Sequence, residues 1–517
     1  MSSSTTAADQ KGVVIIKDSP FGSWESPISS RSITVGSVGI GNLHLSSNEK
    51  RNTGDTVYWT EGRSTEGGRN VLVRYDPTSN SIKKSDRNAI DVTPATSNIR
   101  SRVHEYGGAA MTFASTTNYD NDDGSNKDDT LFFTEFTTQK LFRINLVNNN
   151  DETDPIAVPT TENDNDGQYR YADGVYDKKR GLLFCIRENH GSDGKAEPKD
   201  VINEIVALDV TNNGNVRVIV TGYDFTVAPR LSPDGNTLAC IVWDHPNMPW
   251  DATKLLKVSL PPVDVEENNK DEDDGDVDGV VLAPSSWWET HGKPTVVAGH
   301  DEDTSIIQPL FHPITGKLFY ISDQSGYYNI YMDDGKNAEQ HCVLSMDVDF
   351  GGSSPGWSLG QQGFSFLKDG RLVAVFNRDG ESVLVVANVM DWNPIAFTTS
   401  PIETIEYTSK DGLPMQFGAV QGGTTTDTMD DIYFMGGSPS TPSSVYYWNI
   451  KSNGTPAKIL ACSSTLKFDD SVISVPKQVE FPTTLGTAFG YYYPPKNGDY
   501  KCTTESAPPL LVKAHGG

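Results

Sequence analysis

The sequence predicts an all-β protein built around a β-propeller, and two observations carry that prediction. Long stretches with apolar residues at helical spacing are almost absent. A short β unit recurs instead about seven times, at intervals of roughly 50–80 residues. In each unit an apolar strand follows a turn, and a polar link leads to a second apolar strand. Repeats that cannot bury themselves alone require a closed array, which a propeller provides.

The seven units begin near Asp55, Asp129, Arg180, Ser232, Ile314, Lys368 and Asp430. Most open at Asp-Gly, Thr-Gly or a similar pair, which suits tight hairpin turns because these need positive φ. A long β-sandwich is the alternative, but the regular repetition argues against it. We therefore expect a flexible polar N-terminus over residues 1–20 and a propeller over residues 21–475.

Charge and composition exclude several function classes. The 517 residues carry a formal net charge of −27, much of it in polar inserts at Thr116–Asp129, Pro159–Gln168 and Asp264–Gly279. Nucleic acids and anionic membranes are bound by Lys/Arg clusters, so neither is an expected partner.

The sequence shows no signal peptide, membrane span or cysteine motif. The N-terminus has no apolar core of signal-peptide length, and no window approaches 18 uninterrupted apolar residues. Five widely spaced cysteines form no CxxC pair: Cys185, Cys240, Cys342, Cys462 and Cys502. We expect a cytoplasmic protein with reduced thiols.

The pattern changes beyond Pro476. A strand, a Gly-centred turn and an aromatic strand lead to "PPLLVKAHGG", in which Leu510–Lys513 reads as a further strand. Residues 476–517 therefore look like the opening strands of a second domain.

Several stretches resemble one known family. They are "FGSWESPIS" (Phe21–Ser29), "EGRSTEGGRNVLVR" (Glu61–Arg74), "SRVHEYGGAA" (Ser101–Ala110), "LSPDGNTLACIVWDHPNMPWD" (Leu231–Asp251), "ISDQSGYYNIY" (Ile321–Tyr331) and the terminal "PPLLVKAHGG". Together they resemble the prolyl oligopeptidase family of serine peptidases, in its dipeptidyl-aminopeptidase and acylaminoacyl-peptidase branch. The resemblance covers nearly the whole chain, apart from the acidic inserts and the extreme N-terminus.

The resemblance implies a propeller that gates short peptides into an α/β-hydrolase domain with Ser, Asp and His in that chain order. Leu510–Lys513 would be an early hydrolase strand, and His515, Gly516 and Gly517 would begin the loop that supplies one oxyanion N–H. The segment near residues 21–35 would pack on the hydrolase domain.

The chain contains one G-x-S-x-G sequence, Gly352–Gly356, which we reject as a nucleophile elbow. Pro355 follows Ser354 and has no N–H to donate to an oxyanion. In the family the triad lies downstream of the HGG strand. We therefore expect the natural protein to continue past Gly517, and this chain alone to be inactive.

Three motifs could contact a substrate. In His104–Gly108, Glu105 and Tyr106 would face the central chamber, with Glu105 meeting a peptide amino terminus; the alternative is a structural turn. In Arg187–His190, Arg187 and Glu188 either face substrate or form an inter-blade polar network. In Trp243–Asp251, the residues Trp243, His245 and Trp250 could line the entrance or touch the hydrolase domain, or serve blade packing.

No metal or cofactor is expected. "ENDNDGQYRYAD" (Glu162–Asp173) places acidic residues at EF-hand-like offsets, but β segments rather than helices flank it. The nine histidines show no HExxH or paired spacing.

Two further functions remain open. A non-enzymatic propeller that binds peptides or proteins fits the chain as given, although the terminal HGG argues against it. A propeller enzyme of another class, such as a lactonase or glycosidase, would not explain the tail. The oligomeric state is not predicted.

Overall fold

The computed structural model describes residues 16–47, 55–75, 89–114, 129–146, 154–160, 165–210, 214–262, 285–333, 335, 340–351, 358–390, 402–425, 427–452, 454–464, 466, 468–504 and 507–514. The chain divides into two compact units. The larger comprises Val38–Gly437 and Ser443–Ser463, and the smaller comprises Met1–Ser37, Ser438–Pro442 and Ser464–Gly517.

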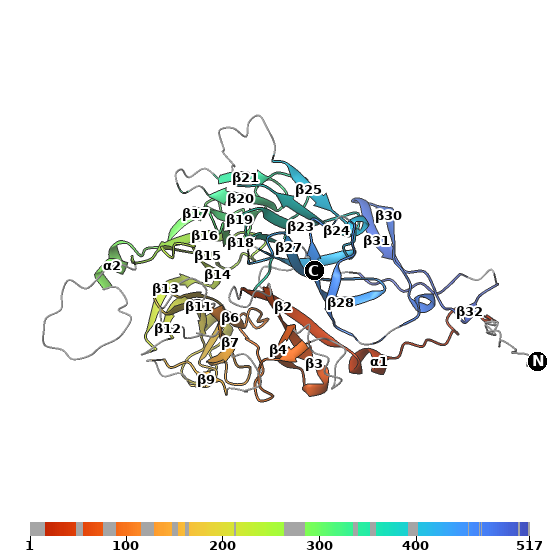
Figure 1. The fold of residues 1–517 in the computed structure, drawn as a ribbon, viewed down its shortest axis with the longest axis horizontal. Helices are drawn as coiled ribbons and strands as arrows, with labels where there is room; N and C mark the ends of the chain where they lie inside the picture. Colours follow the sequence, from red (N-terminus) through yellow and green to blue (C-terminus); the bar gives the residue numbers. More distant parts are fainter. Residues whose placement is uncertain are drawn as a thin grey trace, which may run out of the picture. The chain divides into compact units, whose positions relative to one another are not determined.

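The larger unit consists of seven four-stranded antiparallel sheets, which follow one another in chain order (Figure 1). Blades 1 to 4 are β2–β5 (Val38–Ser47, Asp55–Arg63, Arg69–Tyr75, Ala89–Asp91), β6–β9 (Met111–Ala114, Asp129–Thr134, Leu141–Leu146, Ile156–Ala157), β10–β13 (Tyr169–Asp177, Leu182–Asn189, Ile202–Asp209, Val216–Tyr223) and β14–β17 (Phe225–Leu231, Thr237–Trp243, Lys254–Ser259, Thr295–Ala298). Blades 5 to 7 are β18–β21 (Ile306–Phe311, Leu318–Ser322, Asn329–Asp333, Gln340–Leu344), β22–β25 (Phe364–Phe366, Leu372–Arg378, Glu381–Ala387, Thr404–Tyr407) and β26–β29 (Gln416–Gly422, Asp431–Ser438, Thr441–Asn449, Lys458–Cys462). The predicted seven-bladed propeller is confirmed.

The hydrophobic core is a series of layers between neighbouring blades. Strand β11 shows why, since its side chains alternate between two layers. Leu182, Phe184 and Ile186 belong to the cluster shared with blade 4, whereas Leu183 and Cys185 belong to the cluster shared with blade 2. Both faces of the central strands are therefore buried, which makes "LLFCI" a continuous apolar run rather than an alternating one.

Blade 7 meets blade 1 through the same kind of layer. Trp59 and Val73 of blade 1 pack in one cluster with Tyr433, Val445 and Leu460 of blade 7. Each blade takes its four strands from one continuous part of the chain, so none of the described strands is shared across this seam. Side-chain packing joins the two ends of the propeller, together with a backbone hydrogen bond from the Val38 N–H to the Ser463 carbonyl at 2.8 Å.

The first strands of blades 1, 3, 4, 5 and 7 each carry a β-bulge with one residue at positive φ. These residues are Asn42 (48°), Asp173 (47°), Ala228 (54°), Gln308 (50°) and Ala419 (52°). A bulge changes the direction in which its side chain points. The Asp173 carboxylate accepts the Ala228 N–H at 3.2 Å, and the Gln308 side-chain oxygen accepts the Gly363 N–H at 2.6 Å. In both cases the bulged residue binds the backbone of the next blade.

Helical segments are short. They are α1 (Ser30–Val35), α2 (Ser285–Thr290), η2 (Ser64–Glu66), η3 (Pro198–Asp200), η4 (Ser409–Asp411) and η5 (Asp470–Val472). None of the helices in the described part of the chain is long and apolar enough to cross a membrane.

The smaller unit brings the two ends of the described chain together. Strand β1 (Lys17–Asp18) pairs in parallel with β32 (Tyr500–Lys501), and the Trp24 ring stacks on the Tyr500 ring at 6.4 Å. Strands β30 (Lys477–Thr483) and β31 (Gly486–Tyr492) form an antiparallel hairpin. The strand, turn and aromatic strand expected beyond Pro476 are therefore confirmed.

The prediction of a strand at Leu510–Lys513 is wrong. Residues 507–514 have no regular secondary structure, and the Leu511 side chain is 93% exposed. A strand is defined by hydrogen bonds to a neighbour, and none of the described strands pairs with this segment.

The blade 7 to blade 1 seam gives a stability prediction. Leu45 is buried in the seam cluster, so Leu45→Ala should lower the free energy of unfolding by about 2–5 kcal/mol, measured by urea denaturation. Ile405 is 52% exposed on β25, so the control Ile405→Ala should change it by less than about 0.5 kcal/mol. Equal, small effects would show that the seam is not packed.

Candidate functional site

The His104–Gly108 loop connects blade 1 to blade 2, and its two glycines are required by close backbone contacts. Gly107 has φ 71°, and a Cβ there would lie 2.2 Å from the Ser101 carbonyl oxygen. Gly108 has φ 104°, and a Cβ there would lie 2.6 Å from the Leu359 carbonyl oxygen. Only glycine fits either position. The loop is thereby fixed against the segment that precedes β22.

His104 anchors this loop among residues of blades 3 and 4. Its ring meets the Phe225 ring edge-on at 5.3 Å and the Trp243 ring at 6.0 Å. Its backbone N–H donates to the Glu188 carboxylate at 2.8 Å. Burial lowers the pKa of His104, against the opposing effect of Glu188. The imidazole is therefore held neutral among aromatic rings.

Glu188 is a buried carboxylate with partners from three segments. Besides the His104 N–H, it bonds His190 Nε2 at 2.9 Å and lies 4.0 Å from Arg170 Nη1. Burial alone would raise the pKa of Glu188, but the hydrogen bonds from His190 and from the His104 backbone hold it below its usual value. Glu188 is therefore ionised at neutral pH.

Glu105 and Tyr106 reach solvent. The Glu105 side chain is 74% exposed and accepts a hydrogen bond from Arg170 Nη1 at 2.6 Å, and Tyr106 is 70% exposed. Arg170 thus joins an exposed carboxylate to the buried Glu188. Arg187, by contrast, is buried: it pairs with Glu204 at 2.7 Å and lies over the Tyr169 ring.

The aromatic segment at the end of β15, Trp243–Asp251, contacts His104 and Phe225. Trp243 is buried and stacks on Phe225 with the ring centroids 4.9 Å apart and the planes 10° apart. His245 approaches Phe225 edge-on at 5.2 Å, and its backbone N–H donates to Asp224. Trp250 is 44% exposed.

The structure therefore brings three motifs that are far apart in sequence into one cluster, which we call the motif junction: His104, Glu105, Arg170, Glu188, His190, Phe225 and Trp243. Sequence reasoning missed Arg170 and Phe225, because each stands in a strand with no distinguishing neighbours. The predicted oxyanion residues His515, Gly516 and Gly517, like Gly352–Gly356, lie outside the described residues.

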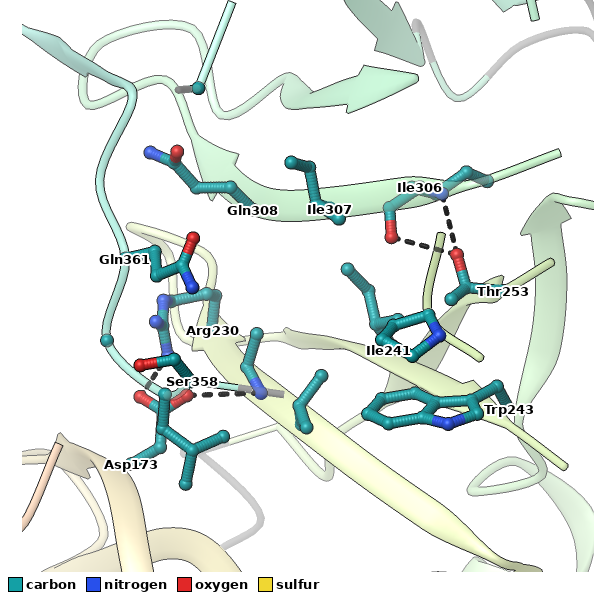
Figure 2. A pocket seen from close by; sticks show the side chains of 16 residues that line it. Asp173, Arg230, Ile241, Trp243, Thr253, Ile306, Ile307, Gln308, Ser358 and Gln361 are labelled. Carbon is teal, nitrogen blue, oxygen red and sulfur yellow. Dashed lines mark hydrogen bonds and ion pairs between the residues drawn. The ribbon is translucent and has the colours of Figure 1, made fainter. Parts of the chain in front are cut away.

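A small pocket of about 50 Å³, open to solvent, adjoins the motif junction and shares Trp243 with it (Figure 2). Its walls come mainly from β14, β15, β18 and the segment before β22. They include Asp173, Val227, Arg230, Ile241, Pro249, Thr253, Ile306, Ile307, Gln308, Ser358, Leu359 and Gln361. Within the described ranges, no group of three or more His, Cys, Asp or Glu side chains could hold a metal ion.

Seven four-stranded blades place the protein in the class of seven-bladed β-propellers. Solved structures of similar fold allow a more specific comparison. The chain is similar to a puromycin-hydrolysing peptidase of Mycobacterium tuberculosis, with TM-score 0.69 and 22% identity over 95% of this chain and 64% of that one. It is also similar to a puromycin hydrolase mutant complexed with PGG, with TM-score 0.71 and 22% identity over 97% of this chain and 65% of that one.

A prolyl oligopeptidase B of Galerina marginata, bound to a 25mer macrocyclization substrate, matches with TM-score 0.52 and 11% identity over 88% of this chain and 55% of that one. The chain thus spans slightly less than two thirds of the puromycin-hydrolysing proteins. No family profile and no curated protein sequence matches. The propeller fold of the prolyl oligopeptidases, expected from the sequence, is confirmed.

The buried carboxylate of the motif junction gives a pH-dependent prediction. Glu188→Gln should lower the free energy of unfolding by about 1–3 kcal/mol at pH 7, because it removes the charge of a group that accepts the His104 N–H, bonds His190 and lies near Arg170. The folded pKa of Glu188 is depressed below its reference value of 4.5. Its contribution is therefore complete above about pH 4.5 and lost as the pH falls through the folded value.

Urea denaturation of both proteins between pH 7 and pH 3 should show the difference shrinking with acid. The matched control is Glu302→Gln, since Glu302 also lies near a cation, Lys254, but is 70% exposed. A Glu188→Gln effect no larger than that of the control would show that Glu188 is not a buried acceptor.

Proposed function

We propose that this chain is the propeller portion of a serine peptidase of the prolyl oligopeptidase family, which hydrolyses short peptides by acyl transfer. In this proposal the Ser, Asp and His of the triad lie outside these 517 residues, so the chain alone is inactive. The observation that carries the proposal is the structural match to puromycin-hydrolysing peptidases over 95–97% of this chain.

The smaller unit supports the same assignment. Apolar side chains of the β30–β31 hairpin are exposed, among them Phe481 (48%), Leu485 (98%) and Phe489 (65%). An exposed two-stranded hairpin with apolar side chains is stable only when it packs on further protein. We assign residues 476–517 to the start of the α/β-hydrolase domain, with His515, Gly516 and Gly517 opening its oxyanion loop. The N-terminal segment that contains Trp24 would pack on this domain.

The motif junction would contact the amino end of the peptide. Two carboxylates, Glu105 and Glu188, share the single guanidinium of Arg170. Of these two carboxylates Glu105 is the exposed one, and it presents its negative charge to solvent. A peptide α-ammonium group is the complementary cation. Propeller gating would add selectivity by size, because folded proteins cannot enter.

A fluorophosphonate probe, which reacts with activated serines, tests the assignment. We expect no labelling of the 517-residue chain and clear labelling of the natural full-length protein, read out by intact mass spectrometry. Labelling of any serine within the chain would overturn the proposal. The coding sequence past Gly517 is an independent check, since it should contain G-x-S-x-G, then Asp, then His.

The role of Glu105 is tested by steady-state kinetics of the natural enzyme. Glu105→Gln should raise KM about two- to fivefold for peptides with a free amino terminus, because an exposed ion pair is worth about 0.5–1 kcal/mol. It should leave N-acetylated peptides unchanged. Glu302→Gln is the matched control and should affect neither substrate. A Glu105→Gln effect that is equal for free and acetylated peptides would remove Glu105 from amino-terminus recognition.

A further inference from the structure

Two arginines of the connection between blades 1 and 2 lie against one aromatic ring of blade 2. The Arg100 guanidinium lies 4.9 Å from the centroid of the Phe136 ring, and the Arg102 guanidinium lies 4.4 Å from it. Arg100 is exposed, and Arg102 and Phe136 are half-buried. We call these three residues the arginine cluster. It lies at the surface, where a ligand can reach it.

One buried side chain fixes the backbone of the whole arginine cluster. Gln139, which is 1% exposed, accepts the Arg102 N–H at 2.8 Å. Its side-chain nitrogen donates to the Phe136 carbonyl at 2.7 Å and to the Arg100 carbonyl at 3.3 Å. The cluster is therefore preorganised, and a ligand need not order this backbone in order to bind.

The two guanidiniums of the cluster have no anionic partner in the part of the chain that the structure describes. Neither Arg100 nor Arg102 forms an ion pair there, although acidic residues outnumber basic ones by 69 to 42 in the sequence. The nearby Lys140 is paired with Asp166 at 3.0 Å, and the Glu135 carboxylate already accepts two backbone N–H groups of its own turn. Two like charges held on one ring repel each other, so a bound anion would relieve this repulsion.

Other stacked arginines of this chain show what such a group binds. Arg378 lies 4.9 Å from the centroid of the Phe376 ring, and its two terminal nitrogens bond the Glu406 carboxylate at 2.8 and 2.9 Å. Arg187, which lies over the Tyr169 ring, is likewise paired with a glutamate. A guanidinium that stacks by its face keeps its N–H edge free, and that edge matches the two oxygens of a carboxylate. The arginine cluster has the ring and the guanidiniums but no such carboxylate among the described residues.

We propose that the arginine cluster is a binding site for a carboxylate group of a ligand, held by Arg100 and Arg102 with Phe136 as their platform. A carboxylate fits better than a dianionic phosphate because Glu105 lies in the same turn. The Glu105 N–H donates to the Arg102 carbonyl at 2.8 Å, and the Glu105 side chain is 74% exposed. Its negative charge would repel a doubly charged anion more strongly than a singly charged one.

The neighbouring charges favour a ligand that carries both signs. Arg170 Nη1 donates to the Arg102 carbonyl at 3.1 Å and to the Glu105 carboxylate at 2.6 Å, so it joins the arginine cluster to the exposed acid. A peptide with free ends carries both an ammonium and a carboxylate group. The assignment to a peptide rests on the proposed function, whereas the preference for a carboxylate does not. The carboxylate can come from the peptide C-terminus or from an acidic side chain.

Acetylated peptides test the proposal on the 517-residue chain by isothermal titration calorimetry, because acetylation removes the ammonium group that Glu105 would attract. Acetyl-Ala-Ala-Ala with a free carboxylate should bind about tenfold tighter than its amide, since it gains charge-assisted hydrogen bonds. Acetyl-Ala-Glu-Ala-amide against acetyl-Ala-Gln-Ala-amide tests a side-chain carboxylate in the same way. Equal binding within both pairs, or no binding, would overturn the proposal. Tighter binding of inorganic phosphate than of either acid would also overturn it.

A pair of matched substitutions locates the binding in the arginine cluster. Arg102→Gln removes one charge and should reduce the preference for the acid over the amide by about threefold or more. The control is Arg378→Gln, since Arg378 lies as far from a phenylalanine ring as Arg100 does but already binds Glu406. It removes the same charge and should leave the preference unchanged. An equal loss in the two variants would assign the effect to net charge and contradict the proposal.

A third variant covers the case in which Arg102→Gln does not fold. Phe136→Leu keeps both charges but removes the ring, and it should reduce the preference for the acid by about two- to threefold. An unchanged preference would count against the cluster. Binding is measured without hydrolysis, so failure of this experiment leaves the fluorophosphonate test standing. Failure of the fluorophosphonate test would remove the assignment to a peptide and leave the carboxylate site standing.

Discussion

The packing of each blade against its two neighbours is the interaction on which the rest of the larger unit depends. A single four-stranded sheet with two apolar faces is insoluble by itself, and a partner on each side removes both faces from water. None of the described strands is exchanged between blades 1 and 7. The seam is therefore held by side chains such as Trp59 and Val445, together with the backbone hydrogen bond from Val38 to Ser463. The bulged first strands add hydrogen bonds between blades, since Asp173 and Gln308 each accept a backbone N–H of the next blade.

The motif junction follows from this arrangement. Glu188 lies in strand β11 of blade 3, yet its partners include a backbone N–H from the loop between blades 1 and 2. A buried carboxylate is tolerated only with such partners, so the blades must pack correctly before the junction exists. Gly107 and Gly108 then bring the loop close enough for His104 to reach the rings of blade 4. The exposed Glu105 is held by the same arginine that supports the buried carboxylate.

Trp243 connects the two features of this region. One contact of its ring is with His104 in the motif junction, and another part of it lines the neighbouring pocket. The junction is charged and partly exposed, whereas the pocket is neutral and apolar.

The sequence by itself predicted a propeller of about seven blades, because middle strands that are buried on both faces read as long apolar runs such as "LLFCI". The exact number of blades came from the structure. The sequence did not reveal the inner and outer strands of each blade, which are short, bulged or half-exposed. It also predicted a strand at Leu510–Lys513, an apolar run that pairs with none of the described strands. It also marked His104–Gly108, Arg187–His190 and Trp243–Asp251 as separate motifs. Only the tertiary structure showed that these three motifs meet, that Glu188 is buried while Glu105 is exposed, and that Arg170 lies between the two carboxylates. The contacts of the motif junction join residues 65 and 84 positions apart, so they depend on blade packing rather than on local sequence.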